Sequence, residues 1–221
     1  MQTLNSTLPR FQCPPPDVIA RSAAAALEEE QRLQSDQRRR RYSEARIPER
    51  YRDAELSHCT PEISEWVDAV LRGSGQDLLL IGKPGRGKTY AACAAANEIL
   101  KHTRCLFAPH GEMLEEVKAT FDTYGESEHD ATAYFTVREF LIIDDLGEAQ
   151  PTEWNLSKTF RILDKRYSEK RPTIYTTMYS PVDLVARLTS KDDSMRRQAI
   201  LSRFMQAKQV IFTGEDRRCN V

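Results

Sequence analysis

One short stretch of the sequence places phosphate-binding residue types between an apolar run and an alanine-rich run. The segment GKPGRGKT, residues 82 to 89, satisfies the pattern GxxxxGK[ST], in which residues without side chains let backbone N–H groups turn toward one point. A helix beginning near Gly87 adds its positive end, Lys88 brings a cation to the terminal phosphates, and the Thr89 hydroxyl is a ligand for Mg²⁺. The predicted phosphate cradle, with the residue that follows it, comprises Gly82, Lys83, Pro84, Gly85, Arg86, Gly87, Lys88, Thr89 and Tyr90.

Two consecutive acids end a second apolar run, EFLIIDDLG, residues 139 to 147. Acids at the carboxyl end of a buried parallel strand emerge beside such a cradle. Asp144 is then expected to hold the hydration shell of Mg²⁺, and Asp145 to orient or deprotonate the attacking water. The alternative is a strand followed by an Asp-rich turn without chemistry. Combined with the cradle, the two acids favour binding and hydrolysis of a nucleoside triphosphate.

Apolar runs and helical patterns alternate along most of the chain. The runs predict strands at 77–82, 105–109, 140–145, 173–178 and 209–214, and the patterns between them predict helices at 88–102, 111–122, 153–170 and 181–206, the last one broken. Such an order predicts a three-layer α/β fold with a parallel sheet covered on both faces. A helix-prone segment from Asp17 to about Arg46 precedes it, so we expect a helical arm and linker at 1–60 and the α/β domain at 61–221.

The composition excludes several other classes of protein. The 221 residues carry 32 Lys+Arg and 33 Asp+Glu, so nucleic acid cannot be held by net charge alone and would need a local basic patch. The five cysteines are scattered without a CxxC pair, which argues against a zinc site and favours free thiols in a reducing compartment. Neither a secretory signal nor a membrane-spanning run is evident. We therefore expect a cytoplasmic protein with no membrane partner.

Four motifs, in their order along the chain, resemble the AAA+ helicase-loader family of the bacterial DnaC and DnaI type, whose ATPase core is shared with the transposition helper IstB. They are GKPGRGKT, LIIDDLG, RPTIYTTMYSP and ILSRF, and the preceding RIPERYRDAEL is also typical of loaders. The resemblance covers about residues 46 to 218. It implies a P-loop NTPase core of the AAA+ type with little or no C-terminal lid domain, and ATP and Mg²⁺ as cofactors. The implied ATPase activity is slow and stimulated by DNA or a partner.

The resemblance also assigns roles to residues at three further motifs. The end of TIYTTM is similar to sensor 1, where Met178 stands in place of a polar residue; because a thioether cannot donate a hydrogen bond, either Thr177 substitutes or hydrolysis is slow. Arg203 resembles an arginine finger that reaches a neighbouring subunit's nucleotide, the alternative being an ordinary surface arginine. GEDRR resembles a sensor-2 element that contacts the nucleotide, with Arg218 the better aligned residue and Arg217 the alternate.

The family likewise implies partners. Loaders carry a single-stranded DNA element after the second core strand, here Lys118, Phe121 and Tyr124, although Phe121 is equally suited to core packing. The implied function is loading of a DnaB-type replicative helicase, held by the N-terminal arm, in DNA replication initiation, with self-association through the ATP interface. Three alternatives stay open: an IstB-like transposition helper, a P-loop kinase acting on a small molecule, and a nucleotide-binding scaffold that does not hydrolyse.

Overall fold

The computed structural model describes residues 16–119, 128–214 and 216, and their contacts divide the chain into two units, Met1–Arg40 and Arg41–Val221. Helix α1, Pro16–Ala45, runs across that division and confirms the predicted arm helix. Along its described exposed part, Leu27 and Leu33 are the large apolar side chains, and both are more than half exposed. An arm of this composition buries little apolar surface of its own.

The second unit contains a parallel sheet of five strands within the described residues. They are β1 Leu78–Gly82, β2 Cys105–Pro109, β3 Phe140–Asp144, β4 Thr173–Thr177 and β5 Lys208–Phe212. Their order across the sheet is β2-β3-β4-β1-β5, with every pair parallel. The carboxyl ends therefore share one edge, where β4 lies between the end of β1 and the end of β3.

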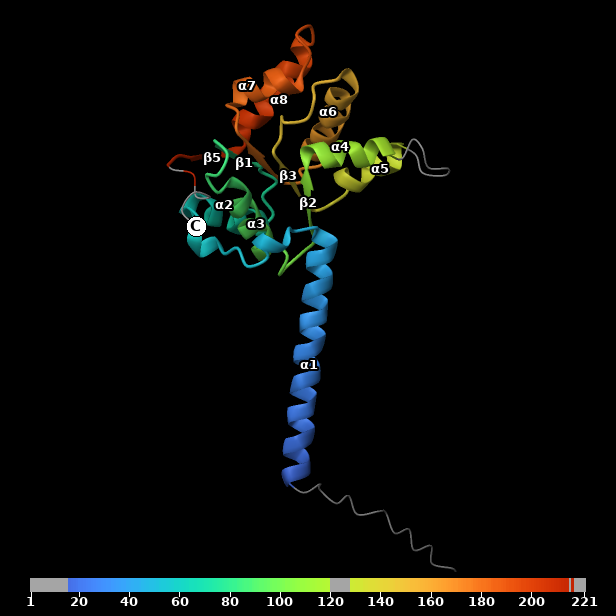
Figure 1. Cartoon of the computed structure of the whole chain (residues 1–221), viewed down its shortest axis with the longest axis vertical. Coiled ribbons are helices and arrows are strands. Elements are labelled where there is room, and N and C mark those ends of the chain that lie inside the picture. Colours follow the sequence, from blue (N-terminus) through green and yellow to red (C-terminus); the bar gives the residue numbers. More distant parts are fainter. Residues whose placement is uncertain (1–15, 120–127, 215, 217–221) are drawn as a thin grey trace, which may run out of the picture. The chain divides into compact units, whose positions relative to one another are not determined.

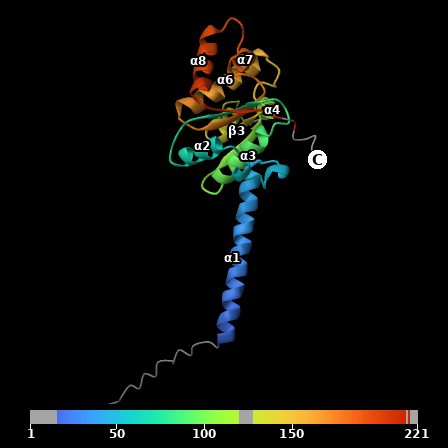
Figure 2. The same ribbon diagram turned by 90° about the vertical axis from the view of Figure 1, so that its left-hand side faces the viewer.

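Helices cover both faces of this sheet, as predicted (Figures 1 and 2). Side chains Leu78 and Leu80 pack toward α2 and α3, whereas Leu79 and Ile81 pack toward the opposite helical layer. The helices of the two layers are α2 Pro61–Leu71 and α3 Lys88–Ile99 on one face, and α4 His110–Ala119, α5 Glu128–Thr136, α6 Glu153–Ser168, α7 Pro181–Leu188 and α8 Ser194–Gln206 on the other. Of these, α5 was not predicted, and α7 and α8 form the expected broken helix.

The segment between α1 and α2 belongs to the contact unit that begins at Arg41. Ile47 and Ala54 are buried in the core cluster of α2 and α3. Two short 3-10 helices follow, Glu49–Tyr51 and Leu56–His58. The Asn97 side-chain amide of α3 donates to the carbonyls of Tyr51, Arg52 and Ala54, which fixes this segment on α3. Among the described residues no helix is both long and apolar enough to span a membrane.

Candidate nucleotide-binding site

The phosphate cradle lies at the carboxyl end of β1 and leads directly into α3. Gly85 and Gly87 have φ of +77° and +94°, a backbone conformation that glycine adopts without steric cost. Gly82 is needed for a different reason, because a Cβ there would lie 2.6 Å from the Phe212 carbonyl oxygen of β5. The glycine spacing therefore reflects two left-handed turns and one close approach of neighbouring strands.

The side chains of Thr89 and Asp144 meet at this edge of the sheet. Thr89 Oγ1 donates to Asp144 at 3.1 Å (Oδ1) and 3.3 Å (Oδ2), although the residues come from α3 and β3. Lys88 is buried, and its Nζ donates to the Lys83 carbonyl at 3.1 Å within the cradle. A hydroxyl and a carboxylate side by side are oxygen ligands of the kind that Mg²⁺ prefers.

Burial disfavours the ionised form of the Asp144 carboxyl group. It raises the pKa of this carboxyl to about 6; the hydrogen bond from Thr176 opposes the shift, the nearby Asp145 adds to it, and Thr89 and Lys88 lower it again. A carboxylate whose ionised form is disfavoured by burial gains from a cation placed against it. The donor set at Thr89 and Asp144 therefore fits a divalent ion.

Thr176 of β4 organises the two acids, a role that its sequence position alone did not reveal. Its hydroxyl donates to Asp144 Oδ1 at 2.7 Å and accepts from the Asp145 backbone N–H at 2.9 Å. Asp145 itself has φ +53°, and its side chain is exposed at the end of β3. Because β4 lies between β1 and β3, its last residues face both the cradle and the acids.

Thr177 and Met178 occupy the end of β4 that was expected to act as sensor 1. The Thr177 hydroxyl is buried and donates to the Leu146 carbonyl at 2.8 Å, so its proton is used within the turn that follows Asp145. Met178 is 44% exposed. In this structure the Thr177 hydroxyl stabilises the turn that follows Asp145. Its contact with a nucleotide stays a prediction.

His110, the first residue of α4, supports the same turn from the other side. The Gly147 N–H donates to His110 Nδ1 at 3.4 Å, and Nε2 lies 2.9 Å from Thr159 Oγ1 of α6. Burial lowers the pKa of this imidazole to about 4, so the ring is neutral and carries its proton on Nε2. A single histidine after an apolar run gives no pattern in the sequence, which is why this contact was not foreseen.

One feature of the cradle fits an anionic ligand. Arg86 Nη1 is buried and has no hydrogen-bond partner among the described residues, and a guanidinium nitrogen of this kind suits a phosphate oxygen. The chain beyond β5 also reaches the cradle, since a Cβ on Gly85 would lie 1.9 Å from Oδ1 of Asp216, four residues after the strand. The segment expected to act as sensor 2 therefore begins beside the cradle, whereas Arg217 and Arg218 lie outside the described residues.

A hollow of about 140 Å³ adjoins the cradle on the side of β5. The Tyr90 hydroxyl accepts from the Glu55 N–H at 3.2 Å and lies 2.9 Å from His58 Nδ1, so the segment before α2 forms one wall. The described lining comes from that segment, α3 and β5 and comprises His58, Cys59, Thr60, Gly87, Tyr90, Ala91, Val210, Ile211, Phe212 and Thr213. Apart from Gly87 and Tyr90, these residues were not predicted as part of a site.

Arg203 of α8 lies at the other end of the sheet from the cradle. Its guanidinium forms an ion pair with Asp164 of α6 and lies 4.8 Å from the centroid of the Tyr167 ring. Its charge also acts on Asp77, the residue just before β1, whereas the cradle comes just after β1. The side chain is 15% exposed. Arg203 therefore cannot belong to the nucleotide site of its own chain.

The predicted DNA-contacting residues are described only in part. Lys118 is exposed in the last turn of α4. Phe121 and Tyr124 lie outside the described residues. The buried residues of α4, which include Met113 and Val117, face the core and leave Lys118 on the outer side of the helix.

Comparison with known proteins identifies the family. The family model described as IstB-like ATP binding protein matches residues 63–220. The replicative helicase loader DnaI of Bacillus subtilis is 24% identical over 186 residues, which cover 80% of this chain and 58% of the relative. The loader DnaC of Escherichia coli K12 is 30% identical over 102 residues, 46% of this chain and 42% of the relative. The chain thus spans about half the length of the curated relatives it matches.

Solved structures of loaders share the fold. A crystal structure of DnaI superposes with a TM-score of 0.63 at 25% identity, covering 78% of this chain and 94% of that one. The DnaC helicase loader gives 0.62 at 24% identity, covering 75% and 100%. AMPPCP-bound DnaA from Aquifex aeolicus gives 0.61 at 18% identity, covering 78% and 53%, a likeness of fold alone. With its glycine cradle facing Asp144 across β4, the chain belongs to the IstB-like ATP-binding protein family, within the AAA+ group that includes the loaders DnaI and DnaC.

Proposed function

We propose that this chain is an ATP-dependent helicase loader acting in DNA replication initiation. The observation that carries the proposal is the contact of Thr89 with Asp144 at 3.1 Å, beside a cradle opened by Gly85 and Gly87. The relatives named as replicative helicase loaders support the class of function. ATP and Mg²⁺ are the proposed cofactors.

At the proposed site each residue has one task. Lys88 leaves the Lys83 carbonyl to bind the terminal phosphates, and the backbone N–H groups of the cradle bind the others. Thr89 and Asp144 hold Mg²⁺, which neutralises phosphate charge when bound. Asp145 orients the attacking water, and Thr176 fixes both acids. The hollow beside Tyr90 receives the base.

Hydrolysis is proposed to need a second copy of the chain. Arg203 lies at the amino end of β1 and the cradle at its carboxyl end, so the only cradle that Arg203 can complete belongs to a neighbour. A planar guanidinium suits the charge that develops on the transferred phosphate. The proposed activity is therefore slow in the single chain and rises on self-association.

The proposed partners are a DnaB-type replicative helicase, bound by the N-terminal arm, and single-stranded DNA, bound near Lys118 with Phe121 and Tyr124. ATP can act as a switch only if its affinity differs between the assembled and released states. The proposed place of action is the cytoplasm.

An ATPase assay with and without single-stranded DNA and helicase tests this function. We expect slow hydrolysis alone and faster hydrolysis with either partner. Lys88→Ala and Arg203→Ala should each be inactive, whereas their mixture should recover activity, because a mixed interface pairs an intact cradle with an intact Arg203. A mixture as inactive as its two components would contradict a site shared between subunits. Hydrolysis that neither single-stranded DNA nor helicase accelerates would contradict the loader function.

The family model also supports a second function, that of an IstB-like transposition helper. It predicts the same ATP site and a different partner. Pull-down with a DnaB-type helicase and with a transposase as bait separates the two, since retention by the transposase alone would favour the helper.

A further inference from the structure

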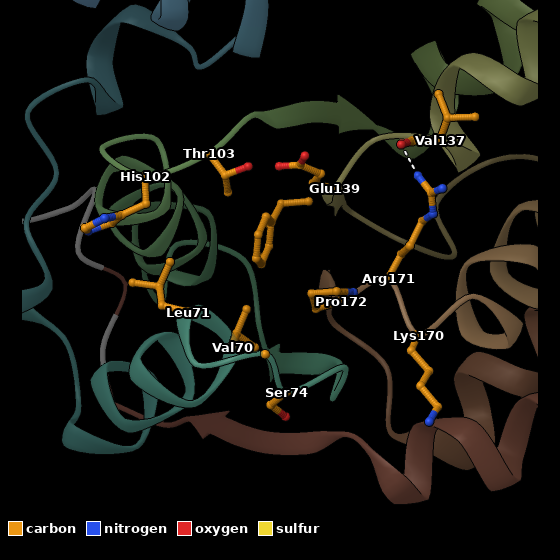
Figure 3. Close-up of a pocket in the computed structure, with 12 residues that line it drawn as sticks. Val70, Leu71, Ser74, His102, Thr103, Val137, Glu139, Lys170, Arg171 and Pro172 are labelled. Atoms are coloured by element: carbon orange, nitrogen blue, oxygen red, sulfur yellow. Dashed lines mark hydrogen bonds between the residues drawn. The ribbon is translucent and has the colours of Figure 1, made fainter.

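A groove of about 700 Å³ lies at the amino-terminal edge of the sheet, away from the nucleotide site (Figure 3). Its walls are the loops that lead into four of the strands, together with the end of α2. The volume falls within the range of about 300–1,000 Å³ that is typical of ligand sites. Neither the cradle nor Arg203 contributes to this groove, so it is independent of the proposed ATPase chemistry.

Part of the lining of the groove is apolar. Val70 and Phe140 are buried in its floor, and Val70 faces Pro172 across the hollow (Figure 3). Two further apolar side chains stay open to solvent: Leu71 is 36% exposed and Val137 is 55% exposed. Exposed apolar side chains that line a concave surface are typical of binding sites for apolar groups.

The rim of the groove is predominantly cationic. Lys170 and Arg171 line it, and Glu139 is the only acid among its described lining residues. Arg72 and Arg104 are exposed and directly adjoin the lining residues Leu71 and Thr103 in the chain. Arg171 is paired with Glu169, whereas the Lys170 amino group has no hydrogen bond or ion pair to another described residue. The excess of positive charge is available to an acidic ligand.

We propose that this groove binds a short peptide segment of a protein partner, in which one large apolar side chain is flanked by acidic residues. The apolar side chain packs against the apolar residues of the lining, which include Val70, Val137 and Pro172, and the acidic neighbours face Lys170 and the arginines of the rim. Charge complementarity selects the acidic flanks, because like charges across an interface are unfavourable.

Single-stranded nucleic acid is the competing ligand for a basic groove, and two features argue against it. Binding of a strand needs exposed aromatic faces on which bases stack, whereas Phe140, the aromatic residue of the described lining, is only 9% exposed. Glu139 lies on the rim beside Thr103, where it would repel phosphate (Figure 3).

The test uses the full chain labelled with ¹⁵N and three probes: a pentapeptide with phenylalanine between two pairs of glutamates, the same peptide with lysines, and oligo(dT). We expect the acidic peptide, at concentrations up to about 1 mM, to shift the amide signals of Val137 and Lys170. Val137→Glu should weaken this binding by about tenfold or more, and Lys170→Glu by several-fold with a smaller salt dependence.

Two matched variants control for general effects of charge. Val182 is 66% exposed on α7, Lys191 lies between α7 and α8, and neither residue lines the groove. Val182→Glu and Lys191→Glu should therefore leave peptide binding unchanged. The proposal is overturned if the acidic peptide causes no shifts, if the lysine peptide binds equally well, or if oligo(dT) shifts the same amides. Equal binding by Val137→Glu and the unaltered chain would also overturn it. Retained ATPase activity in Val137→Glu would show that the fold is intact.

Discussion

At the scale of single residues, the ion pair of Arg203 with Asp164 has two interpretations. Either Arg203 is a structural arginine, or the pair is the resting contact of an arginine finger that engages a neighbour's nucleotide. The guanidinium is packed near Tyr167 and Phe160, as expected of a structural arginine, and Asp164 is 48% exposed, so this ion pair contributes no more than about 1 kcal/mol. A weak pair is easily exchanged for a neighbour's phosphate. The contact in the single chain is thus compatible with a finger that is engaged only on assembly.

Substitutions of Arg203 and of Asp164 distinguish a structural arginine from an arginine finger. Arg203→Ala should leave ATP affinity unchanged and lower stimulated hydrolysis by roughly 10³-fold or more, the range known for such fingers. Asp164→Asn frees the guanidinium and should keep stimulated hydrolysis. Steady-state rates, together with melting temperatures, give the answer. If Arg203 is purely structural, both variants should have lower melting temperatures, and Arg203→Ala should have unchanged turnover.

His110 offers a second prediction at this scale. His110→Ala should lower kcat for ATP by about tenfold while KM changes little, because the turn that carries Asp145 loses its support and the cradle does not. His110→Asn keeps an acceptor near the position of Nδ1 and should recover more activity than His110→Gln, which keeps a donor near Nε2. Equal rates for these two variants, or a change confined to KM, would contradict the positioning role.

At the scale of elements, the amino end of the sheet contains a buried charge network. Asp77, just before β1, accepts from the Thr173 N–H of β4 at 2.8 Å and from the Tyr175 hydroxyl at 3.4 Å. Burial raises the pKa of Asp77 to about 6 from an ordinary 3.8, against the opposing effects of these contacts and of Arg166. The folded chain therefore holds this proton more tightly than the unfolded chain does.

That pKa shift gives a pH-dependent contribution to stability. A raised pKa in the folded state stabilises the fold fully below about pH 4 and loses this contribution as the pH rises through about 6. In Asp77→Asn, which resembles the protonated acid, the free energy of unfolding relative to the unaltered chain should rise between pH 4 and pH 7, by on the order of 2 kcal/mol. Urea unfolding at several pH values measures it, and a difference independent of pH would contradict the pKa shift.

Most elements could be predicted from the sequence because each one has a residue pattern that is typical of its own conformation or burial. The cradle follows from glycines needed at positive φ, and the strands from continuous apolar runs that only a covered parallel sheet buries. Helix α5 lacked such a pattern. The roles of Thr176 and His110 depend on β4 lying between β1 and β3 and on α6 reaching the acidic turn, and spatial order of this kind has no local signal.

At the scale of the whole molecule, the cradle and Arg203 lie at opposite edges of the same sheet, so the proposed assembly places one neighbour at each edge. The cradle and Asp144 occupy the carboxyl edge, and Arg203 and the apolar groove occupy the amino edge. The arm, Met1–Arg40, forms a separate unit of the chain.

The proposed function depends on Mg·ATP binding in the cradle, and isothermal calorimetry measures this binding most directly. We expect one site per chain in the unaltered protein, no measurable binding in Lys88→Ala, and unchanged binding in Lys83→Ala, whose exposed side chain lies in the same turn. An unaltered protein without affinity for Mg·ATP, or a Lys88→Ala variant that binds as tightly as the unaltered protein, would contradict the central claim.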